Sequence, residues 1–329
     1  MNHEPMAGSP AHKEGSAKGG LLAGVTVVIP AYNYAHFLRD ALDSALAQDH
    51  PRVEIIVVDD GSSDNTREVV VAYGDRVRYI HQANAGLSAA RNTGIAAARH
   101  EWIALLDADD MFMSEMLKRL AETVTALPPE FGLIACDCTR MTEDKQPIEK
   151  KRLMDDVTRE IFTEDILLCN QFVADAVLFR RDIALKIGGF DTSLRSSEDR
   201  DMWIRMSRHC RIYKIPEALV RIRVHGTSMS TNAQRMRDNM LRVLAKSRAA
   251  NVVHRWHLPF WAKAHSFLHY QTAWMFRDAG DYRSAIAHLL RSLLLYPFYL
   301  NPHRLNENYL FRVRSLAQFL REVMLRKSR

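Results

Sequence analysis

The sequence has few cysteines and no long apolar run. Its 329 residues contain four cysteines, Cys136, Cys138, Cys169 and Cys210, and none belongs to a Cys-x-x-Cys pair. This spacing argues against zinc-ribbon and dithiol sites, so we expect reduced structural thiols, as in a cytoplasmic protein. No stretch of about 18 apolar residues occurs, and a transmembrane helix is therefore not expected.

A secretory signal is also lacking at the start of the chain. Residues 1–22 are rich in Gly, Ser, Ala and His, without the basic start and apolar centre of such a signal. We predict that they form a disordered tail. The whole chain is 47% hydrophobic, which is enough for a large core and excludes a disordered or collagen-like protein.

Charge is distributed unevenly along the chain. The net charge is +6, but residues 226–329 contain 17 Lys and Arg against 5 Asp and Glu, whereas the first 225 residues contain 28 against 34. The chain therefore combines a mildly acidic part with a strongly basic one. No nucleic-acid-binding motif accompanies the basic residues, so nucleic acid is not an expected partner.

Strand and helix patterns alternate in the acidic part. The β-branched runs Val25–Ile29 and Val53–Val58 predict buried parallel strands, and Trp102–Leu106 predicts another. Helical patterns over residues 36–48 and 86–99 separate them. This alternation predicts an α/β fold with a doubly wound, mostly parallel, Rossmann-like sheet.

Polar loops follow the first two predicted strands. Pro30, Ala31, Tyr32 and Asn33 open a loop at the carboxyl edge, where open α/β sheets bind ligands, although a plain turn also explains them. Adjacent carboxylates, Asp59 and Asp60, end the second strand. One can cap the next helix, and the other can accept hydrogen bonds from a base or ribose; the two interpretations remain open.

Further carboxylates follow later elements. Asp107, Asp109 and Asp110 form a cluster of hard oxygen ligands that suits Mg²⁺ or Mn²⁺ together with substrate phosphates, with a solvated helix start as the alternative. Glu198 and Asp199 begin a helix, where acidic residues commonly interact with the helix dipole. Parallel-sheet topology brings these sites to one face, which favours a ligand site.

Five segments together resemble the bacterial type of glycosyltransferase family 2. They are VTVVIPAYN, VVDDGSSDNT, NAGLSAARNTGIAAARHEWIALLDADD, KIGGFD and SEDRDMWIRM, and their order and spacing are those of the family. The resemblance covers about residues 24–230 and implies a GT-A fold with inverting, metal-dependent transfer. It implies a nucleotide-sugar donor, with UDP-sugar favoured, and a glycan or lipid-linked acceptor in cell-surface polysaccharide synthesis.

The resemblance assigns donor residues by their match to these segments. It implies that the loop from Pro30 to Asn33 lines the nucleotide pocket, that Asp60 binds the base, and that Arg91 and Asn92 lie near the diphosphate and sugar. The Asp-x-Asp motif is Asp107-Ala108-Asp109, with Asp109 as the stronger contact to Mn²⁺ or Mg²⁺ and Asp107 as its partner facing ribose or sugar. His225 matches a histidine near the diphosphate and is a further candidate metal ligand; a surface or core histidine is the alternative.

The same resemblance assigns the acceptor side. Asp199 matches the catalytic base, which takes the proton of the attacking hydroxyl. Gly189 and Phe190 lie in the segment KIGGFD on the acceptor side. Glu198 and Trp203, in the segment SEDRDMWIRM, are assigned to the acceptor side as well. A helix C-cap explains the Gly-Gly pair almost as well.

Other functions fit the sequence less well. A dinucleotide dehydrogenase would need a Gly-x-Gly-x-x-Gly turn after a strand, and none occurs. A nucleotidyltransferase would ordinarily have a Gly-rich phosphate loop and a lysine near the first strand. A catalytically inactive binding or scaffold protein with the same fold is the alternative to an enzyme, although Asp60, Asp107, Asp109 and Asp199 are all present.

The basic part of the chain is predicted to be helical. We expect a transferase domain over residues 23–228 and a basic helical region over 229–329. Residues 264–297 resemble one tetratricopeptide-type helix pair, and a helical hairpin packed on the first domain is the alternative. From Arg312 to Arg329 the pattern is that of a basic amphipathic helix, which can lie on an anionic membrane. The protein would then be peripheral at the inner membrane face; an exposed helix without a membrane role is equally ordinary.

Overall fold

The computed structural model describes residues 24–148, 158–226, 232–298 and 310–327. The tail predicted over residues 1–22 lies outside these ranges, and so does the predicted boundary at residues 228 and 229.

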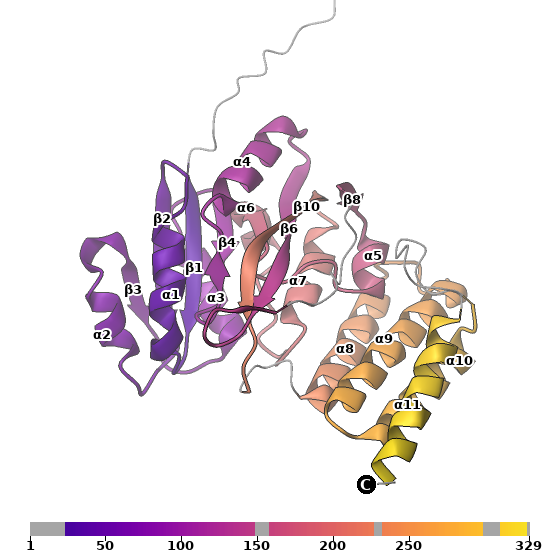
Figure 1. The fold of residues 1–329 in the computed structure, drawn as a ribbon. Coiled ribbons are helices and arrows are strands. Elements are labelled where there is room, and N and C mark those ends of the chain that lie inside the picture. Colours follow the sequence, from indigo (N-terminus) through magenta and orange to yellow (C-terminus); the bar gives the residue numbers. More distant parts are fainter. Residues whose placement is uncertain (1–23, 149–157, 227–231, 299–309, 328–329) are drawn as a thin grey trace, which may run out of the picture.

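A single mixed sheet forms the centre of the molecule (Figure 1). Its main strand order is β3-β2-β1-β4-β9-β6-β10-β5, with β7 beside β6 and β8 beside β10. The strands are β1 (Val25–Ala31), β2 (Val53–Asp59), β3 (Arg78–His81), β4 (Trp102–Leu105), β5 (Met111–Phe112), β6 (Phe131–Met141), β7 (Pro147–Ile148), β8 (Arg159–Ile161), β9 (Val177–Arg180) and β10 (Arg211–Arg223).

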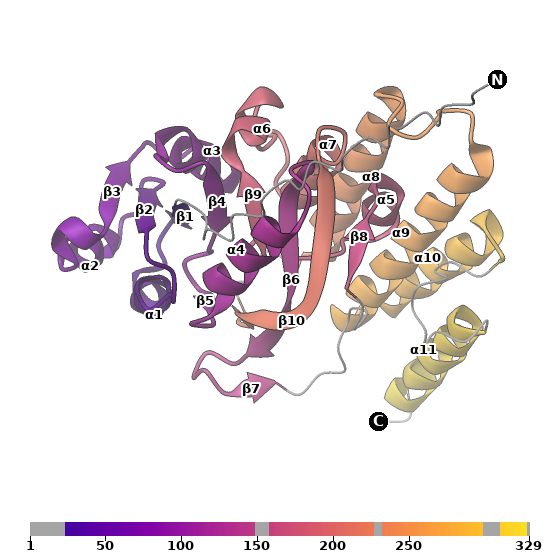
Figure 2. The ribbon, with the colours of Figure 1, turned by 90° about the horizontal axis from the view of Figure 1, so that it is seen from above.

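Helices cover both faces of this sheet (Figure 2). They are α1 (Ala35–Leu46), α2 (Thr66–Val71), α3 (Leu87–Ala97), α4 (Met116–Ala126), α5 (Thr163–Leu168), α6 (Arg181–Lys186), α7 (Glu198–Met206), α8 (Ala233–Ala249), α9 (Leu258–Asp278), α10 (Tyr282–Leu295) and α11 (Phe311–Lys327). A short 3₁₀ turn, η1 (Gly74–Arg76), precedes β3.

The first half of the sheet is parallel, as predicted. β1 lies between β2 and β4, and Val28 is in register with both Ile56 and Leu105. Alternate side chains of β1 point to opposite faces, so Val28 packs with α3 while Val27 belongs to the core under α1 and α4. Burial on both faces explains why these strands are continuously apolar.

The second half departs from the mostly parallel arrangement. β9 is antiparallel to both β4 and β6, whereas β10 is parallel to β6. The strand pattern of β10 was not predicted, because Pro216 and several charged residues interrupt it. In the sheet, the pairing with β6 shifts register between Lys214 and Ala218, and the irregularity accommodates the proline.

The basic helical region shares its core with the sheet. Met240 and Leu244 of α8 and Trp261 of α9 belong to the same buried cluster as Val28. α9 and α10 form a hairpin, and α11 packs on it through the fully buried Phe319. None of the described helices is long and apolar enough to cross a bilayer.

The contact between α3 and β1 predicts the effect of one added methyl group. A Cβ on Gly94 would overlap Cγ1 of the buried Val28, a branched side chain with no room to move. Alanine favours a helix over glycine by about 1 kcal/mol, but overpacking a core costs about 1–3 kcal/mol. The difference predicts that Gly94→Ala lowers the free energy of unfolding by up to about 2 kcal/mol in urea denaturation. Ala96→Ser on the exposed side of α3 should change it by less than about 0.5 kcal/mol; a stabilised Gly94→Ala protein would contradict the packing.

Candidate active site

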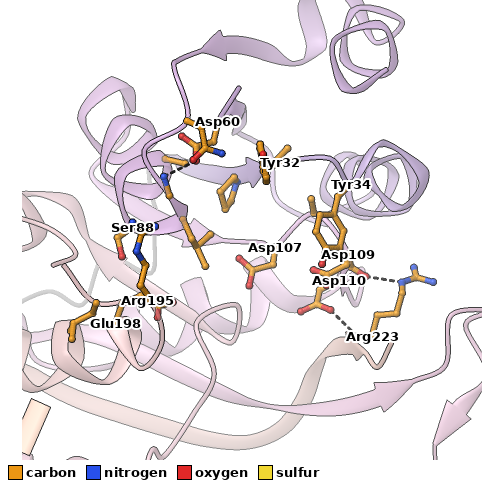
Figure 3. Close-up of a pocket in the computed structure, with 18 of the residues that line it drawn as sticks. Tyr32, Tyr34, Asp60, Ser88, Asp107, Asp109, Asp110, Arg195, Glu198 and Arg223 are labelled. Carbon is orange, nitrogen blue, oxygen red and sulfur yellow. Dashed lines mark hydrogen bonds between the residues drawn. The ribbon is translucent and has the colours of Figure 1, made fainter. Parts of the chain in front are cut away.

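A cavity of about 700 Å³ opens where β1, β2 and β4 end (Figure 3). Its opposite wall comes from β6, β10 and the start of α8, so residues far apart in sequence surround one space. Of the candidate site residues named from the sequence, those that line it are Pro30, Ala31, Tyr32, Asp60, Asp107, Asp109, Asp110, Glu198 and His225. The structure therefore brings the loop after β1 and the three acidic segments together.

Asp60 organises the loop that leads into α3. Its carboxylate accepts hydrogen bonds from the backbone N–H groups of Ala85 at 2.9 Å and Gly86 at 2.8 Å. Gln82 Nε2 donates a third at 2.7 Å. Because each carboxylate oxygen can accept two bonds, Asp60 keeps capacity for a ligand in the cavity. The neighbouring Asp59 does not line the cavity, and its carboxylate accepts from Tyr79 Oη at 2.5 Å and from the Ser62 N–H at 2.8 Å.

Asn33 supports the cavity without lining it. Its backbone has a positive φ of 57°, a conformation that asparagine tolerates better than most residues. Its side-chain oxygen accepts from the Ser63 N–H at 2.8 Å, and its own N–H donates to Ser62 Oγ at 3.0 Å. Asn33 thereby joins the loop after β1 to the loop after β2.

Arg91 lies under the cavity floor, fully buried, and links two of the acidic segments. Its guanidinium forms ion pairs with Asp107 at 2.7 Å and with Glu198 at 2.8 Å. Burial raises the pKa of the Glu198 carboxyl, and the Arg91 charge opposes that shift. Arg91 therefore holds the Asp-x-Asp loop and the start of α7 at a set distance.

Asn92 fastens the Gly-Gly-Phe segment to α3. Its side chain exchanges two hydrogen bonds with the backbone of Phe190, at 2.7 and 2.9 Å. A side chain at Gly189 would overlap the Asn92 amide, so this close approach requires glycine. Trp203 is fully buried and packs edge-on against Phe190. None of Asn92, Gly189, Phe190 and Trp203 lines the cavity, and their contacts are with the protein.

The two aspartates of the Asp-x-Asp motif have different partners: Asp107 pairs with Arg91, and Asp109 contacts His225. Asp109 lines the cavity, and its Oδ2 lies 2.7 Å from Nε2 of the buried His225. Burial raises the pKa of Asp109, the Asp107 charge adds to this, and the His225 contact opposes it. Two residues predicted as metal ligands, 116 positions apart, are thus in direct contact.

A second acidic cluster lies deeper; it joins Asp107 and Asp110, which the sequence analysis named, to Asp175, which it did not. Oxygens of Asp107, Asp110 and Asp175 lie within 4.8 Å of one another. No N–H or O–H group of the described residues donates to either oxygen of Asp175, which is 2% exposed. Burial raises the pKa of both Asp110 and Asp175 well above the usual range, and the negative charges of Asp107 and Asp110 raise the pKa of Asp175 further. Asp175 follows a loop and carries no local motif, and only the fold reveals it.

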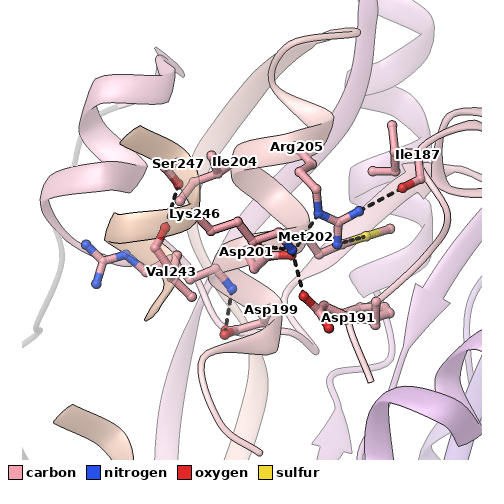
Figure 4. A network of polar contacts seen from close by, with 12 residues as sticks. Ile187, Asp191, Asp199, Asp201, Met202, Ile204, Arg205, Val243, Lys246 and Ser247 are labelled. Atoms are coloured by element: carbon pink, nitrogen blue, oxygen red, sulfur yellow. Dashed lines mark hydrogen bonds and ion pairs between the residues drawn. The ribbon is translucent and has the colours of Figure 1, made fainter. Parts of the chain in front are cut away.

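The predicted base, Asp199, does not line the cavity. Its carboxylate is half-buried, accepting from Asn170 Nδ2 at 2.8 Å and from the Arg200 N–H at 2.7 Å. It lies beside a network in which Lys246 of α8 contacts both Asp191 and Asp201 (Figure 4). Glu198 lines the cavity, and Asp199 faces the loop that contains Asn170.

Arginines of the opposite wall were also missed by sequence reasoning. Arg140, Arg195 and Arg235 line the cavity, and no carboxylate of the described residues forms an ion pair with Arg140 or Arg195. Arg223 instead fastens β10 to the acidic loop, because its N–H donates to Asp110 at 2.7 Å and its Nε to the Asp109 carbonyl at 2.7 Å. These arginines lie outside the five segments that carry the family resemblance, and a single arginine has no local pattern that predicts a binding role.

Comparison with known families and sequences identifies related proteins. The family described as Glycosyl transferase family 2 matches residues 26–187. An uncharacterized glycosyltransferase of Nostoc sp. is 31% identical over 225 residues, which are 64% of this chain and 67% of the relative. The uncharacterized glycosyltransferase EpsJ of Bacillus subtilis is 31% identical over 63% of this chain and 62% of its own length. An uncharacterized glycosyltransferase of Rickettsia typhi is 29% identical over 64% of this chain and 66% of its own length. The chain spans about two thirds of the length of these relatives.

Solved structures share the fold. A mannosyltransferase from Pyrobaculum calidifontis, in complex with GDP-Man and Mn²⁺, has a TM-score of 0.60 at 19% identity, covering 93% of this chain and 82% of that one. A TarS fragment from S. aureus in complex with UDP-GlcNAc has a TM-score of 0.58 at 17% identity, covering 87% of this chain and 97% of that one. These neighbours confirm the predicted GT-A fold.

The buried position of Arg91 predicts a large cost for removing its charge. In Arg91→Gln, Asp107 and Glu198 lose their buried cation, and breaking a buried pair costs about 3–5 kcal/mol. We expect this loss of unfolding free energy in urea denaturation. Arg99→Gln is the matched control, because the Arg99 side chain is 75% exposed and should contribute less than about 0.5 kcal/mol. A similar effect for the two variants would show that Asp107 and Glu198 do not depend on the guanidinium.

Proposed function

The chain belongs to glycosyltransferase family 2, and on this premise we propose that it is an inverting glycosyltransferase acting on a nucleotide-sugar. The acceptor is a hydroxyl of a glycan or of a lipid-linked saccharide, as in cell-surface polysaccharide synthesis. One observation carries the proposal: Asp60, the Asp-x-Asp motif and the start of α7 surround a single cavity at the carboxyl edge of the sheet.

The nucleotide is proposed to lie against the first half of the sheet. Asp60 can accept a hydrogen bond from a base N–H, and Tyr32 is 47% exposed at the cavity, where its ring can stack on the base. The two solved neighbours hold UDP-GlcNAc and GDP-Man, which supports a nucleotide-sugar as the class of donor. UDP is favoured here by family resemblance.

The diphosphate is proposed to lie between the acidic loop and the opposite wall. Arg140 and Arg195 line that wall without a carboxylate partner among the described residues, and a diphosphate supplies the anion that they lack. Arg235 of α8 lines the same wall. The helical region would then contribute directly to donor binding.

Two clusters can be tested for a fit to Mn²⁺ or Mg²⁺. Asp109 and His225 contact each other, and both line the cavity, where a diphosphate can reach them. In the deeper cluster, Asp107 and Asp110 line the cavity, but Asp175 does not. We therefore assign the ion to Asp107, Asp109 and His225, and an imidazole ligand favours Mn²⁺ over Mg²⁺. A bound divalent ion would neutralise charge that develops on the leaving nucleotide.

Asp199 is proposed as the catalytic base. An inverting transfer needs a carboxylate on the acceptor side, opposite the leaving group, rather than inside the donor pocket. Asp199 is partly exposed and held by Asn170, whereas Glu198 is buried against Arg91. Asp199 can thus receive a proton, while Glu198 positions Arg91 and, through it, Asp107.

Nucleotide binding tests the proposed metal site. Calorimetric titration with UDP, GDP and dTDP, with and without Mn²⁺, should show binding of UDP that depends on Mn²⁺. Asp109→Asn should weaken this binding by at least about tenfold, because it removes a charged ligand. Asp175→Asn in the deeper cluster should weaken the binding of UDP less than Asp109→Asn does, because Asp175 does not line the cavity. The reverse pattern would move the ion to Asp110 and Asp175; no binding to the folded wild type would favour an inactive scaffold.

A comparison of the two adjacent carboxylates tests the base. Asp199→Asn should lower kcat by about 10²–10⁴-fold and leave UDP binding nearly unchanged. Glu198→Gln should instead weaken UDP binding and lower stability, since it disturbs Arg91. The measurement is release of nucleoside diphosphate from a panel of nucleotide-sugars with simple glycosides as acceptors. Loss of UDP binding in a folded Asp199→Asn protein would refute this assignment.

A further inference from the structure

Helix α11 is held firmly on the hairpin of α9 and α10 by its inner face. Phe319 is fully buried and packs edge-on against Trp274 at 5.1 Å between ring centres. The buried Arg312 donates to Ser266 Oγ at 3.1 Å and to the Tyr296 carbonyl at 2.7 Å. The outer face of α11 is therefore a preformed surface.

That outer face carries an exposed apolar strip. Leu310, which directly precedes α11, and Val313, Ala317, Leu320 and Met324 within it follow one another at alternating intervals of three and four residues, which places them along one side of the helix. Leu310 is 56% exposed, Leu320 45% and Met324 64%. We call these five residues the α11 strip. Such large apolar side chains in a row, left in water, mark an interaction surface.

Positive charge borders the α11 strip. Arg314 and Arg321 are exposed, lie seven positions apart, and therefore sit on nearly the same side of the helix, next to the strip. Neither forms an ion pair with any of the described residues. The sequence beyond residue 225 has 17 basic residues against 5 acidic ones, so the surroundings are also basic.

We propose that the α11 strip docks the protein on an anionic membrane surface, with the apolar side chains in the acyl boundary and Arg314 and Arg321 on the lipid phosphates. A helix with one apolar side and adjacent basic side chains lies in this interface. Anionic headgroups attract each basic residue near them. The positive charge beside the α11 strip, together with its apolar side chains, therefore favours an anionic membrane as the binding partner.

A second copy of α11 is a poorer occupant. The three-four spacing would suit helix pairing, but it would bring Arg314 and Arg321 of two chains near one another. Glu322 is the one acidic residue in the sequence of α11, and it already accepts from Arg277 at 2.6 and 2.9 Å. A pair of these helices would therefore lack the acidic side chains that could balance the arginines.

Vesicle binding by the full chain tests the docking surface. Co-sedimentation uses vesicles of equimolar phosphatidylglycerol and phosphatidylcholine, and vesicles of phosphatidylcholine alone for comparison. The wild type should bind the anionic vesicles, and Leu320→Glu with Met324→Glu should reduce the partition coefficient at least about tenfold. Arg314→Gln with Arg321→Gln should reduce it about tenfold as well, as should high salt for the wild type.

A matched control comes from the other end of the molecule. Val71 on α2 is 62% exposed, and Figure 1 shows α2 and α11 at opposite ends. Val71→Glu should bind anionic vesicles as the wild type does, while circular dichroism confirms that all variants are folded. The vesicle assay tests membrane docking, and the titration with UDP in solution tests the proposed transfer function, so one proposal can fail without the other.

Three results would overturn the proposal. The first is that the wild type fails to bind anionic vesicles, and the second is that the strip variants bind them like the wild type. The third is a dimer in sedimentation equilibrium that Leu320→Glu with Met324→Glu abolishes while vesicle binding stays unchanged. That result would assign the strip to a second copy of the chain.

Discussion

The arrangement of the site depends on one buried cation. The Arg91 guanidinium comes from α3, lies fully buried, and is held between Asp107 after β4 and Glu198 at the start of α7. A buried cation in that position is favourable only while the carboxylates surround it, and the Glu198 carboxylate is buried at acceptable cost only beside it, whereas Asp107 is partly exposed. The interaction therefore sets the distance between the Asp-x-Asp loop and the start of α7. The partly exposed Asp199 follows Glu198 directly, so its place depends on the same contact.

The opposite wall of the cavity depends on β10 and on the helical region after it. Arg223 binds the acidic loop through Asp110 and the Asp109 carbonyl, and His225 contacts the Asp109 carboxylate. The next described helix, α8, adds Arg235 to the cavity and Lys246 to the network beside α7. The helical region is consequently part of the site's support, because removing it would expose the core and open the cavity on one side.

The molecule thus presents two surfaces of different chemistry. The cavity gathers carboxylates and arginines, which suits a diphosphate with a divalent ion. The α11 strip offers apolar side chains bordered by arginine, which suits a lipid surface. The two are joined through the packed helices α8, α9 and α10, so a docked protein would hold its cavity at a defined position relative to the membrane. If the acceptor is carried on a lipid, the docked enzyme and its acceptor would meet by diffusion in the plane of the membrane.

The sequence by itself determined the parallel half of the sheet, the helical nature of the last part of the chain, and the acidic loops after β2 and β4. These are local signals: a β-branched run such as Val25–Ile29 must be buried on both faces, and the carboxylates that follow the neighbouring parallel strands β2 and β4 must lie at the carboxyl edge of the sheet. Only the tertiary structure decided that Arg91 binds Glu198, 107 positions away, and that Asp175 lies beside Asp110. It also decided that Pro216 sits within a long strand. Burial and long-range pairing set these features, since the free energy of a buried charge depends on neighbours that no local pattern specifies.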